Sequence, residues 1–127
     1  INKHMAQYED IEIDQGTSVK YKIQLLDVGG GRRDLSDCFA RGSLKHTYGT
    51  DSADAVNFLT NIDAPPEQGI INFSLSPQQT STLTQRRYVY DIEIEYEKDS
   101  VAVVERVLEG KAFLSNQVTD MITRPIS

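Results

Sequence analysis

Four carboxylates at alternate positions are the clearest candidate chemistry in the chain. In the segment RRYVYDIEIEYEKDS, residues 86–100, the acids are Asp91, Glu93, Glu95 and Glu97. Side chains two apart on an extended chain share a face, with Cβ atoms about 6.5–7 Å apart, so they could hold a hard cation if a second strand added oxygens. The simpler interpretation, which we favour, is a solvated strand face with basic cross-strand partners. Candidate partners are Lys20, Lys22, Arg106 and Lys111.

A glycine-rich stretch, a histidine and a cysteine are the other candidates. Residues 29–33, GGGRR, could hold an anion through backbone N–H groups and two guanidiniums, but they lack a phosphate-loop ending, so we expect a turn. His46 has no nucleophile motif around it. Cys38 is expected to be a small core residue rather than a reactive thiol. From the sequence we therefore expect that the protein is not an enzyme and that it has no catalytic residue, no metal site and no cofactor.

Composition narrows the class of protein further. The chain has 127 residues, 39% of them apolar, which is enough for one globular domain with its own core. The net charge of −6 disfavours nucleic-acid binding, because an acidic chain repels phosphate backbones. No apolar run approaches the roughly 20 residues that cross a bilayer, so no membrane partner is expected. The single cysteine excludes an internal disulfide.

Alternation of apolar and polar residues predicts strands throughout the chain. In VKYKIQL, residues 19–25, Val19, Tyr21, Ile23 and Leu25 share one face, while lysines and a glutamine occupy the other. Residues 86–96 show the longest such pattern, with tyrosines and isoleucines opposite the acids. We expect about seven strands, over residues 8–13, 18–27, 38–45, 55–62, 69–76, 86–96 and 101–115.

Local signals between the strands predict turns and one short helix. Ser76 can cap a helical turn that begins at Pro77, and Leu83 would pack that turn against the sheet. Tyr88 is a candidate for the tyrosine that bonds back to the preceding connection in immunoglobulin-like domains. Gly42 and Gly110 lie inside expected strands, so we predict an irregularity at Gly42 and a bulge or bend at Gly110.

These elements predict an all-β fold: a two-sheet antiparallel, immunoglobulin-like β-sandwich of about seven strands with one short helical turn. A partly closed barrel is the alternative. Residues 1–4 are interpreted as an expression remnant, because His-Met is common at engineered junctions, with Met5 as the native start. Residues 5–115 form the predicted domain. Residues 116–127 form a C-terminal arm, which could pack on its own sandwich or on a neighbouring copy; its apolar residues are Val118, Met121, Ile122 and Ile126.

The order of several segments resembles small virion proteins of tailed phages, whose β-sandwich is related to the N-terminal domain of phage upper baseplate proteins. The resemblance covers about residues 9–119. It is carried by Gln15-Gly16 before the second strand of the family pattern, Asp34-Leu35 at the opening of the third, the tyrosine-rich residues 88–91 and LEG at residues 108–110. Upper baseplate proteins continue into a platform for receptor-binding proteins, and this chain stops. That departure favours a stand-alone assembly or decoration part.

The resemblance implies a non-enzymatic structural protein of the tail, baseplate, neck or capsid surface. It implies other virion proteins as partners, repeated copies as a homo-oligomer, and a virion location after assembly in the host cytoplasm. Partner contacts are expected from the apolar residues of the arm and from Arg32 and Arg33. The alternative is a small module that binds carbohydrate or a host surface, in which Tyr48, Arg32 and Arg33 would cluster at one end of the sandwich.

Overall fold

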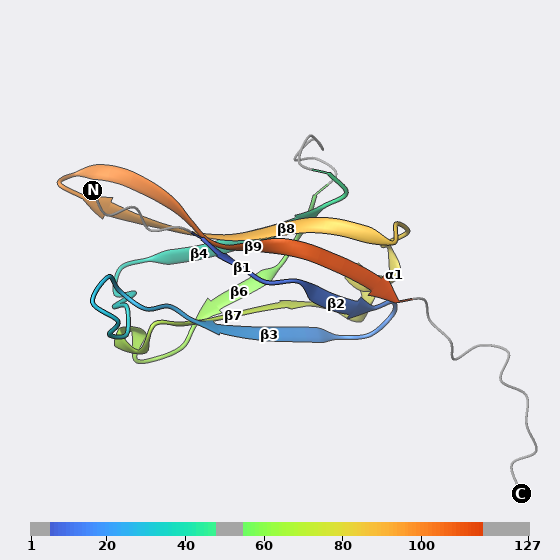
Figure 1. The fold of residues 1–127 in the computed structure, drawn as a ribbon, viewed down its shortest axis with the longest axis horizontal. Coiled ribbons are helices and arrows are strands. Elements are labelled where there is room, and N and C mark those ends of the chain that lie inside the picture. Colours follow the sequence, from blue (N-terminus) through green and yellow to red (C-terminus); the bar gives the residue numbers. More distant parts are fainter. Residues whose placement is uncertain (1–5, 48–54, 116–127) are drawn as a thin grey trace, which may run out of the picture.

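The computed structural model describes residues 6–47 and 55–115, which form two β-sheets packed face to face (Figure 1). The larger sheet has the order β1-β9-β8-β4-β5, with β2 also paired to β9; the smaller sheet has the order β3-β7-β6. The strands of the larger sheet are β1 (Gln7–Tyr8), β2 (Ile11–Asp14), β4 (Phe39–Lys45), β5 (Val56–Asn57), β8 (Arg87–Lys98) and β9 (Val101–Ser115). Those of the smaller sheet are β3 (Val19–Gln24), β6 (Leu59–Ile62) and β7 (Ile70–Leu75).

The predicted all-β sandwich is confirmed, with differences in detail. The described residues contain nine strands rather than about seven, because two expected strands are each divided. Residues 8–13 form the two short strands β1 and β2, which both run parallel to β9, so the sandwich is not wholly antiparallel. Residues 55–62 divide at Phe58: β5 pairs with β4 in the larger sheet, and β6 pairs with β7 in the smaller one.

The core lies between the sheets and follows the alternation seen in the sequence. On β8, Tyr88, Tyr90, Ile92 and Ile94 are buried, while the acidic residues between them face outward. On the smaller sheet, Ile23, Ile71, Phe73 and Leu75 complete the core from the other side. The rings of Phe58, Phe73 and Tyr90 pack together with centroids 5.2–6.1 Å apart. Such burial is the main stabilising contribution in a domain of this size.

The connection between β7 and β8 contains the predicted helix. Helix α1 (Pro77–Ser81) begins after Ser76, whose hydroxyl accepts a hydrogen bond from the Gln79 N–H while the Gln79 side chain accepts one from the Ser76 N–H. This capping box satisfies two backbone donors that a helix start would otherwise leave unpaired. Leu83 is buried, as predicted. A 3₁₀ helix (η2, Pro66–Gln68) precedes β7.

Tyr88 forms the predicted link to the preceding connection. Its hydroxyl oxygen accepts hydrogen bonds from the backbone N–H groups of Thr84 and Gln85, at 2.8 and 2.9 Å. Two other tyrosines tie strands to the edge of the larger sheet: the Tyr90 hydroxyl donates to the Glu9 carbonyl at 2.6 Å, and the Tyr21 hydroxyl donates to the Glu12 carbonyl. The Tyr21 bond joins the smaller sheet to β2 of the larger one.

Gly42 does not produce the predicted irregularity and Gly110 does not produce a bulge; each glycine instead makes room for a close neighbour. The β4–β8 pairing is regular through Gly42, where a Cβ atom would lie 2.4 Å from Ile92 Cδ1. At Gly110 a Cβ atom would lie 1.8 Å from the Glu9 carbonyl oxygen, so only glycine allows β9 to approach the chain beside β1. The irregularity of β9 lies at Val107, which has no partner on β8: Ile92 pairs with Leu108, and Glu93 pairs with Arg106.

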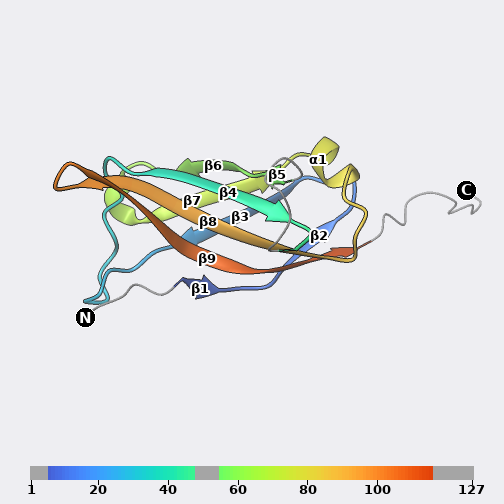
Figure 2. The ribbon, with the colours of Figure 1, turned by 90° about the horizontal axis from the view of Figure 1, so that it is seen from above.

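The tip of the β8–β9 hairpin extends past the rest of the sandwich. β4 pairs with β8 only as far as Glu95, whereas β9 follows β8 to Lys98. Figures 1 and 2 show this end of the hairpin, in orange, projecting beyond the ends of the other strands. We refer to residues 96–103 as the hairpin tip.

Candidate interaction surface

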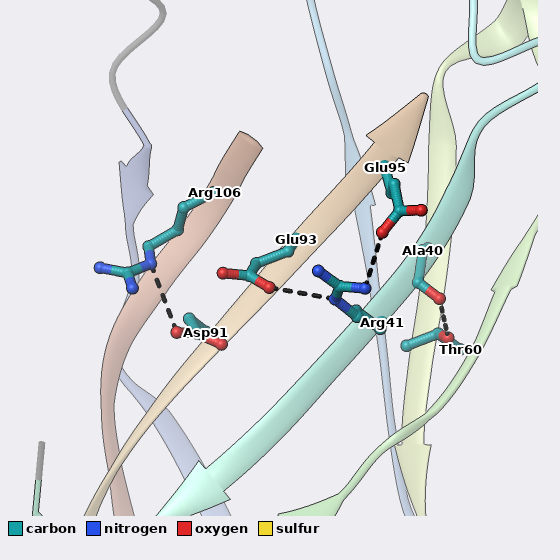
Figure 3. A network of polar contacts seen from close by, with 7 residues as sticks. All are labelled: Ala40, Arg41, Thr60, Asp91, Glu93, Glu95 and Arg106. Carbon is teal, nitrogen blue, oxygen red and sulfur yellow. Dashed lines mark hydrogen bonds and ion pairs between the residues drawn. The ribbon is translucent and has the colours of Figure 1, made fainter. Parts of the chain in front are cut away.

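The outward face of the larger sheet carries a ladder of charged side chains (Figure 3). In the pairing of β4 with β8, Arg41 lies opposite Glu93. Two residues along each strand, on the same face, Phe39 lies opposite Glu95. The Arg41 guanidinium donates from Nε to Glu93 at 3.1 Å and from Nη1 to Glu95 at 2.9 Å. The hydrogen bond that Arg41 donates to Glu93, with the one it donates to Glu95, raises the pKa of Arg41. One arginine on β4 therefore spans two of the four acids.

A second ion pair continues the ladder on β9. Arg106 Nε lies 3.3 Å from Asp91 Oδ2. Burial raises the pKa of Asp91, and the charge of Arg106 opposes that rise. The favoured interpretation of the acids as a strand face with basic partners thus holds for Arg106. Lys20 and Lys22 lie on β3 in the other sheet, where Lys22 pairs with Asp63, and Lys111 lies opposite Val89, so those three expectations were wrong.

Exposed apolar side chains lie beside this charged ladder. Phe39 is 75% exposed and, with Val104, flanks Glu95 in one row across β4, β8 and β9. Val101 at the hairpin tip is also exposed. Large apolar groups gathered beside polar ones on a sheet face are typical of surfaces that contact other proteins.

An open groove lies between the hairpin tip and the loop before β4. Its volume is about 990 Å³. Cys38, Phe39 and Tyr96 provide its less polar wall, and four carboxylates lie around it: Asp34, Asp37, Glu95 and Glu97. Two hydrogen bonds from Ser36 hold the pKa of Asp34 below its ordinary value. The groove therefore combines an aromatic wall with an excess of negative charge.

Arg33 closes one side of this groove as part of an internal ion pair. Its guanidinium makes a bidentate contact with Glu105 on β9, with N–O distances of 2.7 and 2.8 Å, and both side chains are 15% exposed. The Tyr96 hydroxyl donates to Glu105 at 3.1 Å, and the Arg33 guanidinium lies 5.9 Å from the Tyr96 ring centre. These contacts give Arg33 a role inside the molecule, while its predicted role as a partner contact stays a prediction.

The glycine-rich stretch is a turn, as favoured. Its conformation is held by Asp27, whose Oδ1 accepts hydrogen bonds from the N–H groups of Gly29 and Gly31 at 2.9 and 3.0 Å. These are the donors that an anion would have needed, so the chain's own carboxylate takes the place of the ligand. Arg32 is exposed, and its backbone bridges to Leu26.

Cys38 and His46, the two other residues considered in the sequence, lie in different surroundings. Cys38 is half-buried against the core, and burial raises the pKa of its thiol, which disfavours the reactive thiolate. His46 is exposed and lies edge-on to Tyr88, with ring centres 6.2 Å apart. Within residues 6–47 and 55–115, no group of three or more histidine, cysteine or acidic side chains is placed to hold a metal ion. In the same ranges no helix has the length and apolarity to span a membrane.

Several sequence predictions lie outside the described residues. They are the expression remnant at residues 1–4, the loop around Tyr48, and the arm at residues 116–127 with its apolar positions Val118, Met121, Ile122 and Ile126. The end-clustering expected for Tyr48, Arg32 and Arg33 is therefore not tested. Two residues of the surface were missed from the sequence: Phe39 and Arg41, which lie on the same face of β4. The period-two pattern from Phe39 onward was the signal that could have placed both on the outer face.

Comparison with solved structures supports the fold. The N-terminal domain of phage TP901-1 ORF48 matches with a TM-score of 0.54 at 6% sequence identity, over 84% of this chain and 85% of that one. More distant matches are the periplasmic chaperone SfaE (TM-score 0.39, 12% identity, 91% of this chain and 58% of that one) and AggA, the major subunit of aggregative adherence fimbriae type I from Escherichia coli (TM-score 0.32, 10% identity, 88% and 91%). No family model and no curated protein sequence matches the chain.

The chain thus shares its fold with a domain of a phage protein. At 6% identity the likeness shows the sandwich and its topology, and the chemistry of the surface has to be argued from this chain's own residues. The two fimbrial matches are too distant to add to the argument.

Proposed function

We propose that this protein is a non-enzymatic structural part of a tailed-phage virion and acts through contacts with other proteins. The observation that carries the proposal is the likeness in fold to the N-terminal domain of phage TP901-1 ORF48, which extends over most of both chains. The segment order of the sequence points to the same class of protein. The surface adds support, because the charged ladder and its exposed aromatic neighbour form a broad sheet face suited to protein contacts rather than to a small substrate.

Repeated copies are part of the proposal. The β1–β2 and β3 strands are edge strands among the described residues, and edge strands present backbone groups that a neighbour can pair with. The apolar residues of the arm provide a second means of contact between copies. We expect light scattering to give a defined multimer for the whole chain and a smaller mass for a chain that ends at Ser115. Monomers only, at every concentration tested, would remove the homo-oligomer from the proposal.

Virion membership has a direct test. Particles purified from a lysate of the host would be analysed by mass spectrometry, and we expect this chain in fixed proportion to the tail or capsid proteins through successive density gradients. A gene position beside capsid or tail genes would agree with that result. Recovery of the chain only in the soluble fraction of the lysate would reject the proposal.

A further inference from the structure

The end of β8 has an unpaired edge at the groove. Tyr96, Glu97 and Lys98 pair with β9 on one side, but within the part of the chain that the structure describes no strand follows them on the β4 side. The cause is a turn just before β4. Asp37 adopts a positive φ of 61°, and the Cys38 N–H donates to the Leu35 carbonyl. The chain before Phe39 therefore does not continue alongside β8. This turn leaves backbone groups of β8 open where a further strand would continue the sheet.

The side chains around this edge favour an extended segment with basic residues. Phe39 and Tyr96 offer ring surface, and Asp34, Asp37, Glu95 and Glu97 surround it. Two cations also line the groove, but Arg33 is engaged by Glu105. Because Glu95 is paired with Arg41, this leaves Lys98 against three carboxylates. An incoming lysine or arginine would therefore improve the charge balance of the groove, whereas an acidic segment would be repelled.

A second copy of this chain fits the edge poorly. Paired residues of neighbouring strands share a face, and symmetric pairing of β8 with its copy would centre on Tyr96, Glu97 or Lys98. The first sets Glu97 against Glu95, the second sets Glu97 against Glu97, and the third sets Lys98 against Lys98. The β1–β2 edge is acidic, with Glu9, Asp10, Glu12 and Asp14. β3 carries Lys20 and Lys22, but Lys22 is paired with Asp63. Burial, and after it the nearby charges of Asp14 and Glu12, raise the pKa of Tyr21 on the same strand, so acids already lie close to β3.

We propose that the unpaired end of β8 and the adjoining groove bind an extended, basic segment of a different protein, which adds to the larger sheet as a strand beside Tyr96, Glu97 and Lys98. Backbone hydrogen bonds would supply the contact, and alternate side chains of the segment would meet Glu95, Glu97 and the Phe39 ring on one face and Tyr96 on the other. The inference rests on the proposed function, in that it names one kind of partner for the assembly surface.

The test uses the full chain and a fluorescent probe peptide of alternating lysine and valine. We expect fluorescence anisotropy to show binding at least roughly tenfold tighter than for a peptide of alternating glutamate and valine. The double variant Asp37→Asn with Glu97→Gln should weaken binding roughly fivefold or more, because within residues 6–47 and 55–115 neither acid has an ion pair to lose. The matched control Glu9→Gln with Glu12→Gln changes the net charge equally and should leave binding unchanged.

Two N-methylated probes separate an added strand from charge attraction. In an extended peptide, the N–H groups of odd and even residues point to opposite edges of the strand. Methylating one set removes the donors of one edge, so the probe methylated on the edge that faces β8 should lose binding if the strands pair. Equal weakening by both double variants, equal binding by both methylated probes, or no binding at all would overturn the inference. So would a multimer that the groove variant alone dissociates, because the occupant would then be a second copy. Particle membership is measured separately, so this inference can fail while the proposed function stands.

Discussion

Single residues decide how closely the chain can approach itself in this sandwich. The hydroxyl of Tyr88 satisfies two backbone donors in the turn before β8, and Gly110 admits the Glu9 carbonyl to a space that no Cβ atom could share. Neither effect is visible in apolar burial alone. The first effect depends on the hydroxyl oxygen of Tyr88, and the second depends on the absence of a Cβ atom at Gly110. Each can be tested by one substitution.

Replacing the Tyr88 hydroxyl tests the turn. We expect Tyr88→Phe to keep the ring packed and to lower the free energy of unfolding by about 1 kcal/mol, because the N–H groups of Thr84 and Gln85 lose their acceptor and are left to water. Denaturant unfolding with an unchanged m-value would measure it. An unchanged midpoint would mean that the two hydrogen bonds contribute nothing net.

Adding one methyl group at Gly110 tests the close approach. Gly110→Ala is expected to destabilise the protein by about 3 kcal/mol, since the Glu9 backbone must move away from β9. Gly29→Ala is the matched control, because its added Cβ would lie 3.5 Å from the nearest atom, Asp27 Oδ1, and it should change stability by less than about 0.5 kcal/mol. Thermal unfolding of both variants gives the comparison, and similar melting temperatures would contradict it.

At the scale of elements, two arginines form ion pairs between neighbouring segments, one pair largely buried and the other on the exposed sheet face. The Arg33–Glu105 pair joins the loop before β4 to β9 with little exposure, whereas Arg41 joins β4 to β8 on the open face, where its side chain is 55% exposed. Water screens the second pair far more than the first. The two arginines therefore allow one kind of contact to be compared in two environments.

We expect Arg33→Ala to cost about 2 kcal/mol of stability, because it leaves the Glu105 carboxylate in a partly dry place with the Tyr96 hydroxyl. Arg41→Ala should cost less than about 1 kcal/mol despite its two carboxylate partners. Chemical denaturation in low and high salt would measure both. A larger loss for the Arg41 variant would show that the surface ladder, and not the Arg33 pair, stabilises the strand order.

The contact between the two sheets at Tyr21 predicts a dependence on alkaline pH. Burial, with Asp14 and Glu12 nearby, raises the pKa of Tyr21 from 10.0 to about 12. Between about pH 10 and pH 12 the unfolded chain loses this proton while the folded chain keeps it, so stability is full below pH 10 and falls as pH rises. The fall should be smaller in Tyr21→Phe. Parallel pH curves for the two proteins, from denaturant midpoints, would count against the effect.

At the scale of the whole molecule, the core of the described residues draws on both sheets. The buried apolar cluster begins at Ile11 and ends at Ala112, and it includes residues from both sheets. The surface that we assign to protein contacts lies on the larger sheet and its hairpin tip, away from that core. Folding and assembly can therefore be changed separately.

A chain that ends at Ser115 is expected to unfold in one cooperative transition, with a melting temperature within a few degrees of the whole chain, because no residue of the described core is removed. Differential scanning calorimetry of the monomeric fractions would compare the two chains. A large loss of melting temperature would mean that residues 116–127 contribute to the stability of the domain.

Alternation along β3, β7 and β8 was sufficient to predict those strands and their buried faces, because the period of two is a local property of an extended chain. The Ser76 cap and the Tyr88 hydroxyl were also predictable, since both act within a few residues of themselves. For the candidate surface, the sequence by itself placed the acids on a solvated face and named Arg106 among their partners.

Tertiary structure decided what depends on strands far apart in the chain. The switch between sheets at Phe58, the unpaired Val107, the parallel pairing of β1 and β2, and the choice of Arg41 over Lys20 as a partner all depend on register. The alternation within one strand decides which face is buried, but it does not say which distant strand is the partner or where the pairing begins. The open edge at the hairpin tip has the same origin, because it exists only where one strand continues after its neighbour has ended.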